Sequence, residues 1–172
     1  RNTLKSQPFI QGIGSFSGTS LDGNYRSMST RKDKDNNNLL VYLTTWDKEF
    51  IDIMGINLVK DNHLSGDVKY INEELAGKLS LGDGESEVTW GDGKVMQVAG
   101  IFSNFHMTNI LDPYQPFLIS VKDTDEIEDP NFMVKTNGDQ LAWKKLCDLV
   151  KEVDGSTEDI DWKVQSVDDN IK

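Results

Sequence analysis

The chain has 172 residues, of which 37% are hydrophobic and 27% charged, as in a folded protein of one sizeable domain or two small ones. Its formal net charge is −11, from 29 acidic against 18 basic residues. Such a surface repels phosphate backbones and anionic lipid headgroups, which argues against nucleic acid as a partner and against direct docking on a membrane.

The first third of the chain predicts two strands, a polar loop between them and a short helix. Ile10–Ser17 is a weak strand because it holds two glycines, whereas β-branched and aromatic residues make Leu39–Thr45 a strong one. The intervening Leu21–Asn38 is rich in Asp, Asn, Ser and Arg and has no apolar period, which predicts a loop. A helix is expected over Asp47–Met54, with Gly55 as its stop.

The middle of the chain predicts a strand, a second helix and a hairpin. The strand Val68–Ile71 leads into the helix Asn72–Leu81, which has an asparagine N-cap and two glutamates in its first turn. The turn residues Gly91–Gly93 then precede the strand Val95–Phe102, which indicates a hairpin. Phe117–Val121 is a further strand.

The last third predicts an acidic loop over Lys122–Pro130, a strand over Phe132–Lys135, a helix over Asp139–Val153 and a strand over Asp161–Val167. The element order, β-β-α, then β-α-β-β-β, then β-α-β, predicts a mixed α+β protein. The only cysteine, Cys147, rules out an internal disulfide and a structural zinc site. It lies on the apolar side of the last helix, where we expect a small core residue rather than a nucleophile.

No stretch reaches the roughly 18 to 20 apolar residues that a helix needs to cross a bilayer. The chain begins at Arg1, without a methionine and without the pattern of a signal peptide. We therefore expect a piece of a longer protein, with any anchor or targeting segment outside it.

The sequence has few residues that could act as catalytic groups, and no catalytic or cofactor-binding residue is predicted. Only His63 and His106 could act as bases at neutral pH. His63 lies in a polar stretch and is expected to be exposed, while His106 follows a strong strand and is expected to pack at its end or contact a partner. Nucleophile-elbow, zinc-protease, P-loop and dinucleotide-binding motifs are absent from the sequence.

Two aspartate-rich stretches, Asp33–Asn38 and Asp123–Pro130, are candidates for calcium-binding loops. An EF-hand loop needs a glycine at its sixth position, where these stretches place Asn38 and Glu128. No metal site is therefore predicted. Of the four tryptophans, Trp90 is the candidate for an exposed contact, because it adjoins a turn. Trp143 and Trp162 are expected in the core or at its boundary.

Four segments follow one another in an order that resembles a known family: Thr44–Ile56, Val68–Leu79, Val98–His106 and Ile110–Ile119. This order resembles the extracytoplasmic (periplasmic core) domain of MacB/FtsX-type ABC-transporter permeases. Those domains carry a short helix, a strand running into a helix that starts with Asn-Glu, a glycine-containing strand, an Asp-Phe-His or Asn-Phe-His turn and a proline-marked strand.

In this chain the Asn-Glu pair is Asn72-Glu73, the glycine strand is Val98–Ile101 and the turn is Asn104–His106. Two turns depart from the family pattern. The stretch Val59–Leu64 replaces a Gly-Arg-x-Phe turn, and Leu81–Glu85 replaces an Asp-Pro-Ile-Gly-Lys segment. Because both departures fall in turns, they concern loop shape and partner contacts more than the fold.

The resemblance implies a discontinuous architecture. A porter-like α/β-sandwich lobe would be built from both chain ends, residues 1–55 and 130–172. A small mixed α+β lobe, of the kind called Sabre, would be inserted between them over residues 56–129. The chain would then be a soluble domain excised between two transmembrane helices.

The function implied is that of a non-catalytic domain at the periplasmic face of the bacterial inner membrane. It would couple cytoplasmic ATP hydrolysis to the handling of a periplasmic partner or substrate. Its partners would be a cognate ABC ATPase, reached through the transmembrane part, and a periplasmic or outer-membrane protein; the full-length protein would be dimeric. No cofactor is expected. A ligand-sensing extracytoplasmic domain of a membrane receptor is the alternative, and an acidic hydrolase was set aside.

Overall fold

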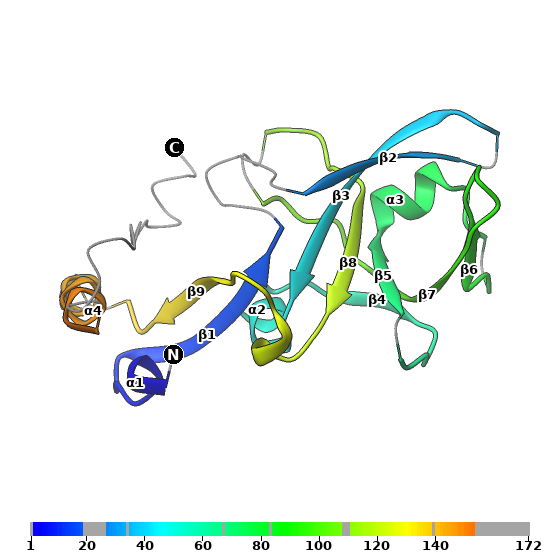
Figure 1. Cartoon of the computed structure of the whole chain (residues 1–172). Helices are drawn as coiled ribbons and strands as arrows, with labels where there is room; N and C mark the ends of the chain where they lie inside the picture. The colour runs from blue at the N-terminus through cyan, green and yellow to red at the C-terminus, as the bar shows by residue number, and fades with distance from the viewer. Residues whose placement is uncertain are drawn as a thin grey trace.

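The computed structural model describes residues 2–18, 27–33, 35–66, 68–82, 84–107, 111–138 and 140–153 (Figure 1). The strand predicted over Asp161–Val167, and with it Trp162, lies outside these residues. No helix in the described part is both long enough and apolar enough to cross a membrane.

A mixed nine-stranded sheet organises the described residues, in the order β4-β7-β5-β8-β3-β1-β9 with β2 paired to β3 and β6 to β7. The β3–β8 and β5–β7 pairs are parallel, and the other pairs are antiparallel. The strands are β1 (Ile10–Ser17), β2 (Met28–Lys32), β3 (Asn38–Trp46), β4 (Leu58–Asp61), β5 (Lys69–Asn72), β6 (Glu87–Thr89), β7 (Val95–Phe102), β8 (Phe117–Val121) and β9 (Asn131–Thr136).

Four α-helices accompany the sheet in the described residues: α1 (Asn2–Lys5), α2 (Lys48–Met54), α3 (Glu73–Lys78) and α4 (Gln140–Val153). A 3₁₀ turn, η1, covers Thr124–Glu126 within the predicted acidic loop. The predicted α+β class is therefore confirmed. α3 is shorter than the helix predicted over Asn72–Leu81, because Ser80 takes a left-handed backbone with φ of 51° soon after α3 ends.

Two strands were not predicted. β2 lies inside the predicted loop and pairs with β3 along its whole length, from Met28 opposite Tyr42 to Lys32 opposite Asn38. Its sequence, MSTRK, has one apolar residue, so no alternation reveals it. β4 is an exposed edge strand beside β7, and it too lacks a hydrophobic period. Both strands arise from pairing with a neighbour rather than from local propensity.

Three clusters of buried residues hold the fold together. The first lies between the sheet and α2 and is rich in aromatic rings. The second lies between the sheet and α3. The third joins α4 to α1 and to the outer halves of β1 and β9. Their central members are Phe16, Trp46, Phe50, Phe105 and Phe117; Val41, Ile71, Leu75, Val98 and Leu118; and Phe9, Ala142 and Leu146.

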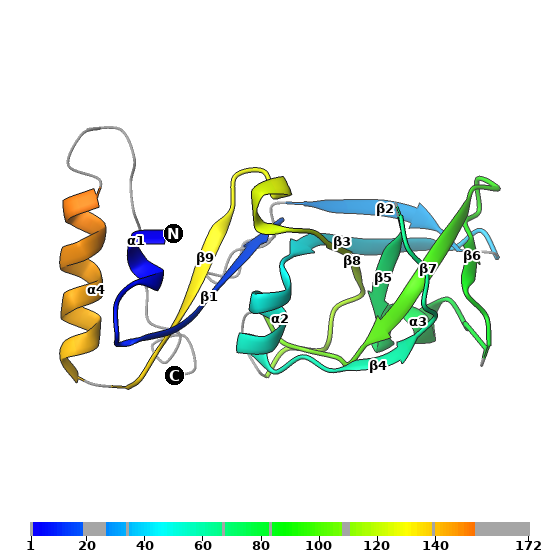
Figure 2. The ribbon, with the colours of Figure 1, turned by 90° about the horizontal axis from the view of Figure 1, so that it is seen from below.

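The third cluster is set apart from the others. Figures 1 and 2 show α1 and α4 together at the far end of the β1–β9 ribbon, away from α3. Ile10 of β1 and Val134 of β9 pack against the cluster, so α4 contacts strands from both ends of the chain. Leu146 is buried and Val150 is half-buried in this position.

The sheet and the first core cluster both cross the expected lobe boundaries. β8, from the middle of the chain, pairs in parallel with β3, from the first part. Trp46 packs against Phe105 with ring centroids 4.9 Å apart, and Phe105 packs against Phe117 at 4.8 Å. The lobe of residues 1–55 and 130–172 and the inserted lobe of residues 56–129 therefore share one sheet.

Three side-chain environments differ from the expectations. Trp90 is buried in the second cluster, only 3% exposed, under the Arg31 guanidinium 4.9 Å from its ring centroid. The hairpin tip that was expected to expose it folds back on β2, where the Gly91 N–H donates to the Lys32 carbonyl at 2.8 Å. Trp143, expected at the core or its boundary, is 43% exposed on α4, and Cys147 is half-buried rather than fully buried.

α2 crosses β1 at a glycine. A Cβ atom at Gly14 would lie 2.4 Å from the Phe50 Cα, so only glycine allows this close approach. The Phe16 and Phe50 rings then stack with centroids 4.8 Å apart. The second glycine of the weak strand is thus the reason why α2 can cover the sheet.

Asp47 caps α2 and joins it to two other segments. Its Oδ1 accepts a hydrogen bond from the Phe50 N–H at 2.8 Å, and its Oδ2 accepts one from Thr124 Oγ1 at 2.7 Å. Burial would raise the pKa of this carboxyl, but hydrogen bonds from the backbone of Ser15 and Phe50 and from Thr124 outweigh burial and lower the pKa below its ordinary value.

This lowered pKa predicts acid sensitivity. The charged Asp47 stabilises the fold above the pKa of the unfolded chain, and its contribution is lost as the pH falls through the lower folded pKa, below about pH 4. In urea unfolding at a series of pH values, Asp47→Asn is expected to lose stability less steeply in this range than the parent. Asp52→Asn, an exposed change on the same helix, is the control. Parallel curves for Asp47→Asn and the parent would contradict the lowered pKa.

Candidate functional site

The candidate catalytic groups lie on different parts of the sheet. His63 follows the edge strand β4 and is highly exposed, with its Nδ1 3.3 Å from Asp61 Oδ2. Cys147 lies on α4, which packs on the β1–β9 ribbon at the opposite edge. His106 follows β7, and its ring lies against Tyr114 with centroids 4.4 Å apart. The three residues are therefore not assembled into one site.

The aspartate-rich stretch Asp33–Asn38 forms the turn between β2 and β3. Asp33 Oδ1 accepts from the Asp35 and Asn37 N–H groups at 2.9 and 2.8 Å, and its Oδ2 accepts from Asn37 Nδ2 at 3.1 Å. Asp33 thus acts as an Asx-turn residue. Among the described residues, no group of three or more His, Cys, Asp or Glu side chains could hold a metal ion.

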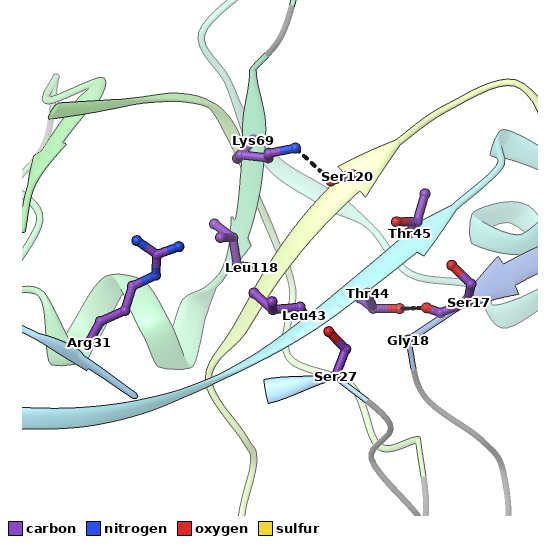
Figure 3. Close-up of a pocket in the computed structure, with 10 residues that line it drawn as sticks. All are labelled: Ser17, Gly18, Ser27, Arg31, Leu43, Thr44, Thr45, Lys69, Leu118 and Ser120. Carbon is purple, nitrogen blue, oxygen red and sulfur yellow. Dashed lines mark hydrogen bonds between the residues drawn. The ribbon is translucent and has the colours of Figure 1, made fainter. Parts of the chain in front are cut away.

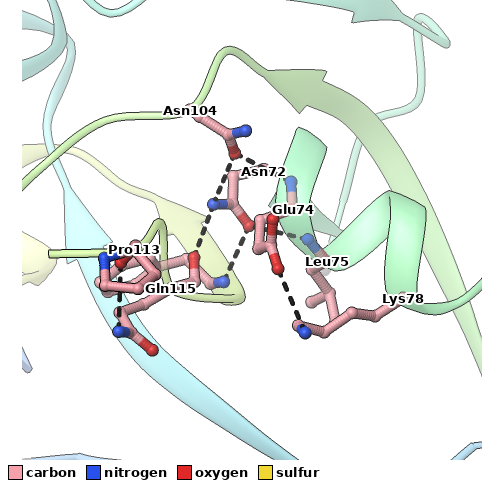
Figure 4. Close-up of polar contacts among 8 residues, drawn as sticks. Asn72, Glu74, Leu75, Lys78, Asn104, Pro113 and Gln115 are labelled. Atoms are coloured by element: carbon pink, nitrogen blue, oxygen red, sulfur yellow. Dashed lines mark hydrogen bonds and ion pairs between the residues drawn. The ribbon is translucent and has the colours of Figure 1, made fainter.

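Asn72 is the centre of a polar network in which all its side-chain hydrogen-bonding groups are used (Figure 4). The side chain is fully buried, with an exposed fraction of 0%. Its Oδ1 accepts from the N–H groups of Leu75 at 3.2 Å and Phe117 at 2.8 Å. Its Nδ2 donates to Asn104 Oδ1 at 3.1 Å and to the Gln115 carbonyl at 2.8 Å. One residue therefore joins the start of α3 to both ends of the β7–β8 loop.

Asn104 completes this connection from the side of the loop. Its Oδ1 also accepts from the Glu74 N–H at 2.8 Å, and its own N–H donates to Glu73 Oε2 at 3.0 Å. The first turn of α3 is thus capped by two asparagines from different segments. The Asn72-Glu73 pair and the Asn104–His106 turn, which are far apart in the sequence, meet in this network.

The three residues of the Asn104–His106 turn make different contacts. Asn104 caps α3, Phe105 is 7% exposed and inserts into the first core cluster, and His106 turns outward to stack on Tyr114. Asn104 and Phe105 thus attach the described part of the β7–β8 loop, residues 103–107 and 111–116, to α3 and to the core. The loop presents Tyr114, 44% exposed, and Leu111, 85% exposed.

An apolar and aromatic surface on a firmly anchored loop is suited to contact another protein. On the neighbouring β2–β3 hairpin, Met28 is 52% and Leu40 is 42% exposed. Met28 lies opposite Tyr42, whose N–H donates to the Pro116 carbonyl at 2.9 Å. We refer to Leu111 and Tyr114 as the loop surface.

Sequence reasoning identified only part of this arrangement. It noted Asn72 as a helix cap and His106 as a packing or contact residue. It did not identify the link between Asn72 and Asn104, because a hydrogen bond between residues 32 positions apart leaves no periodic signal. The one signal in the sequence that relates to this link is the order of the Asn72-Glu73 pair and the Asn104–His106 turn along the chain.

Comparison with solved structures shows what this fold resembles. A domain described as part of a permease from Porphyromonas gingivalis superposes with a TM-score of 0.58 over 93% of this chain and 76% of its own, at 15% sequence identity. The extracellular domain of the noncanonic ABC-type transporter YknZ from Gram-positive bacteria superposes with a TM-score of 0.57 over 91% of this chain and 83% of its own, at 16% identity. No protein-family model and no curated protein matches the sequence.

Both structures are described as domains of permeases or transporters, the second explicitly as an extracellular domain. The predicted resemblance to the extracytoplasmic domain of MacB/FtsX-type permeases is therefore confirmed at the level of the fold.

Proposed function

We propose that this chain is a non-catalytic extracytoplasmic domain of a MacB/FtsX-like ABC-transporter permease. The observation that carries the proposal is the agreement of fold with the two permease domains over more than nine tenths of this chain. The Asn72–Asn104 network supports it, because the two short motifs on which the sequence resemblance depends meet there.

In this role the domain couples ATP hydrolysis by a cognate ABC ATPase to the handling of a periplasmic or outer-membrane protein partner. The continuous sheet offers a path for such coupling. The β1–β9 ribbon, which carries α1 and α4, connects through β3 to β8, and β8 leads directly from the β7–β8 loop. A displacement of the ribbon would therefore reach the loop surface through hydrogen-bonded strands.

The lobes proposed from the sequence, residues 1–55 with 130–172 and residues 56–129, would be the two parts that move relative to one another. α4 belongs to the first and α3 to the second. The third cluster supports this division, because all its members come from residues 1–55 and 130–172. The second cluster includes Val41 of the first part, and together with the shared sheet it limits how far the lobes can move apart.

The partner proposal is tested by isolating the full-length protein from its native membrane in mild detergent. An ATP-binding-cassette subunit is expected in the purified complex, either as a second chain or as a further part of the same chain, and the complex should hydrolyse ATP. Recovery with a kinase or cyclase domain instead would support the receptor alternative and contradict the permease proposal.

A further inference from the structure

One asparagine of the chain, Asn137, is followed by a glycine, Gly138, and this pair links a strand to a helix. Asn137 comes directly after β9, which ends at Thr136, and α4 begins soon after the pair, at Gln140. Every other asparagine is followed by a residue with a side chain. An asparagine before glycine loses its side-chain amide most readily, because glycine has no Cβ to hinder attack by its own backbone nitrogen.

The space around Gly138 is open. Asn137 and Gly138 are both exposed, and a Cβ atom at Gly138 would meet no atom of the described residues within 4 Å, apart from its chain neighbours. Gly18 is the opposite case, although it also follows a strand and also has a positive φ. A Cβ atom there would lie 2.3 Å from the Leu43 carbonyl oxygen of the adjoining strand β3 (Figure 3). The main chain at Gly138 therefore has room to change shape during a reaction.

The Gly138 backbone nitrogen, which would be the nucleophile, is held only weakly. Its N–H donates to Thr136 Oγ1 at 3.4 Å, a long distance for a bond that is usually about 2.7 to 3.2 Å. The Asn137 N–H, in contrast, donates to the Phe9 carbonyl at 3.0 Å and continues the pairing of β1 with β9. The ordered pairing thus extends to the residue that carries the amide, and the attacking nitrogen follows it.

We propose that Asn137 is a site of spontaneous deamidation. The Gly138 nitrogen loses its proton to base in the solvent and attacks Asn137 Cγ, and the side-chain nitrogen leaves as ammonia, which closes a five-membered succinimide ring. Water then adds to one of the two ring carbonyls. Opening of the bond at Cγ gives aspartate, and opening at the main-chain carbonyl gives isoaspartate. In both products one water is consumed, one ammonia is released and an amide is replaced by a carboxylate.

The isoaspartyl product changes the link between β9 and α4, because its main chain runs through the side chain and is one carbon longer. α4 packs on the β1–β9 ribbon through the third core cluster, in which Ala142, near the start of the helix, is 1% exposed. A link of altered length and direction no longer matches this packing. The isoaspartyl form therefore holds α4 less firmly on the ribbon. This modification is independent of the permease proposal and uses no residue of the loop surface.

The test is to incubate the folded 172-residue chain in mildly alkaline buffer beside the urea-unfolded chain, and to follow the tryptic peptide Thr136–Lys144 by mass spectrometry. Asn137 is expected to react about tenfold faster or more than Asn38 and Asn57, which are also exposed but are followed by leucine. Its rate in the folded chain should lie within about tenfold of its rate in the unfolded chain, because little of the structure resists the reaction.

Two variants separate the effects of the reaction. Asn137→Gln keeps an amide but would have to close a six-membered ring, so no product is expected at residue 137. Asn137→Asp carries the new charge on a main chain of normal length. Hydrogen exchange of the α4 amides should become faster in the incubated parent, in proportion to its isoaspartate content. It should stay as in the fresh parent for incubated Asn137→Gln and for fresh Asn137→Asp.

The proposal is overturned if the folded chain forms no product at Asn137 while the unfolded chain reacts. Reaction at Asn38 and Asn57 as fast as at Asn137 would also overturn it, since neither the glycine nor the open turn would then matter. Unchanged exchange in α4 of the isoaspartyl form, or an equal increase in incubated Asn137→Gln, would contradict the loosening of α4.

Discussion

Leu75→Asp is expected to lower the free energy of unfolding by about 4 kcal/mol, because it buries a carboxylate without a partner. Leu75 is on the inner face of α3 and has an exposed fraction of 0%. It packs in the second core cluster with Ile71, Val98 and Leu118, none of which offers a hydrogen bond from its side chain. Urea unfolding of the variant and the parent measures the loss.

The matched control for this change is Leu141→Asp. Leu141 is 58% exposed on α4, so the same substitution there removes a leucine without burying a charge. We expect a change within about 0.5 kcal/mol. A similar loss in both variants would show that burial of Leu75 does not determine its contribution.

The distribution of the damage tests the proposed lobes. Hydrogen exchange of Leu75→Asp should speed up in α3, β5 and β7, while the amides of α4 keep the protection they have in the parent, because α4 belongs to the separate third cluster. If exchange rose equally in α4, the chain would unfold as one cooperative unit and the division into two lobes would be contradicted.

Asn72→Ala is expected to cost about 3 kcal/mol, the second largest effect among these substitutions. The change removes four hydrogen bonds at once and leaves the N–H groups of Leu75 and Phe117 and the Gln115 carbonyl without their side-chain partner. Because those groups are in α3, at the start of β8 and in the β7–β8 loop, the loop should also lose order. Thermal unfolding and amide exchange of residues 111–116 measure both effects.

A further variant and a control distinguish the role of Asn72 as a helix cap from its role in the hydrogen-bond network. Asn72→Asp keeps an acceptor for the Leu75 and Phe117 N–H groups but places a carboxylate against Asn104 Oδ1 and the Gln115 carbonyl, so it should be nearly as damaging as alanine. Asn57→Ala is the control, since Asn57 is exposed and its hydrogen bonds to Ser103 use only its backbone. If Asn72→Ala behaved like Asn57→Ala, the network would not hold the loop.

Local signals in the sequence were sufficient for elements that carry their own caps or turns. Asp47 and Gly55 delimit α2 as predicted, and Asn72 starts α3. The strands β1, β7 and β8 have the predicted bounds. For the helices a capping residue flanks the element, and for β7 and β8 a run of β-branched and apolar residues lies within it.

Features that depend on distant partners were missed. β2 exists because its polar residues pair with β3 across the turn that Asp33 stabilises, and Trp90 is buried because the β6–β7 hairpin folds onto β2. Arg31 lies on β2 over the buried Trp90 ring, in a stretch that the sequence predicts as a polar loop. A single sequence carries no record of strand register, so neither this pairing nor the Asn72–Asn104 link could be predicted.

The central claim, that this domain moves with the ATP cycle of a permease, is tested most directly by a distance measurement in the full-length complex. Spin labels would replace Leu111 on the β7–β8 loop and Leu141 on α4, both exposed, in a Cys147→Ser background. The distance distribution between the labels is predicted to differ between the nucleotide-free complex and the complex trapped with ATP, and to stay constant when the ATPase cannot bind nucleotide. The same distribution in all three states would contradict the claim.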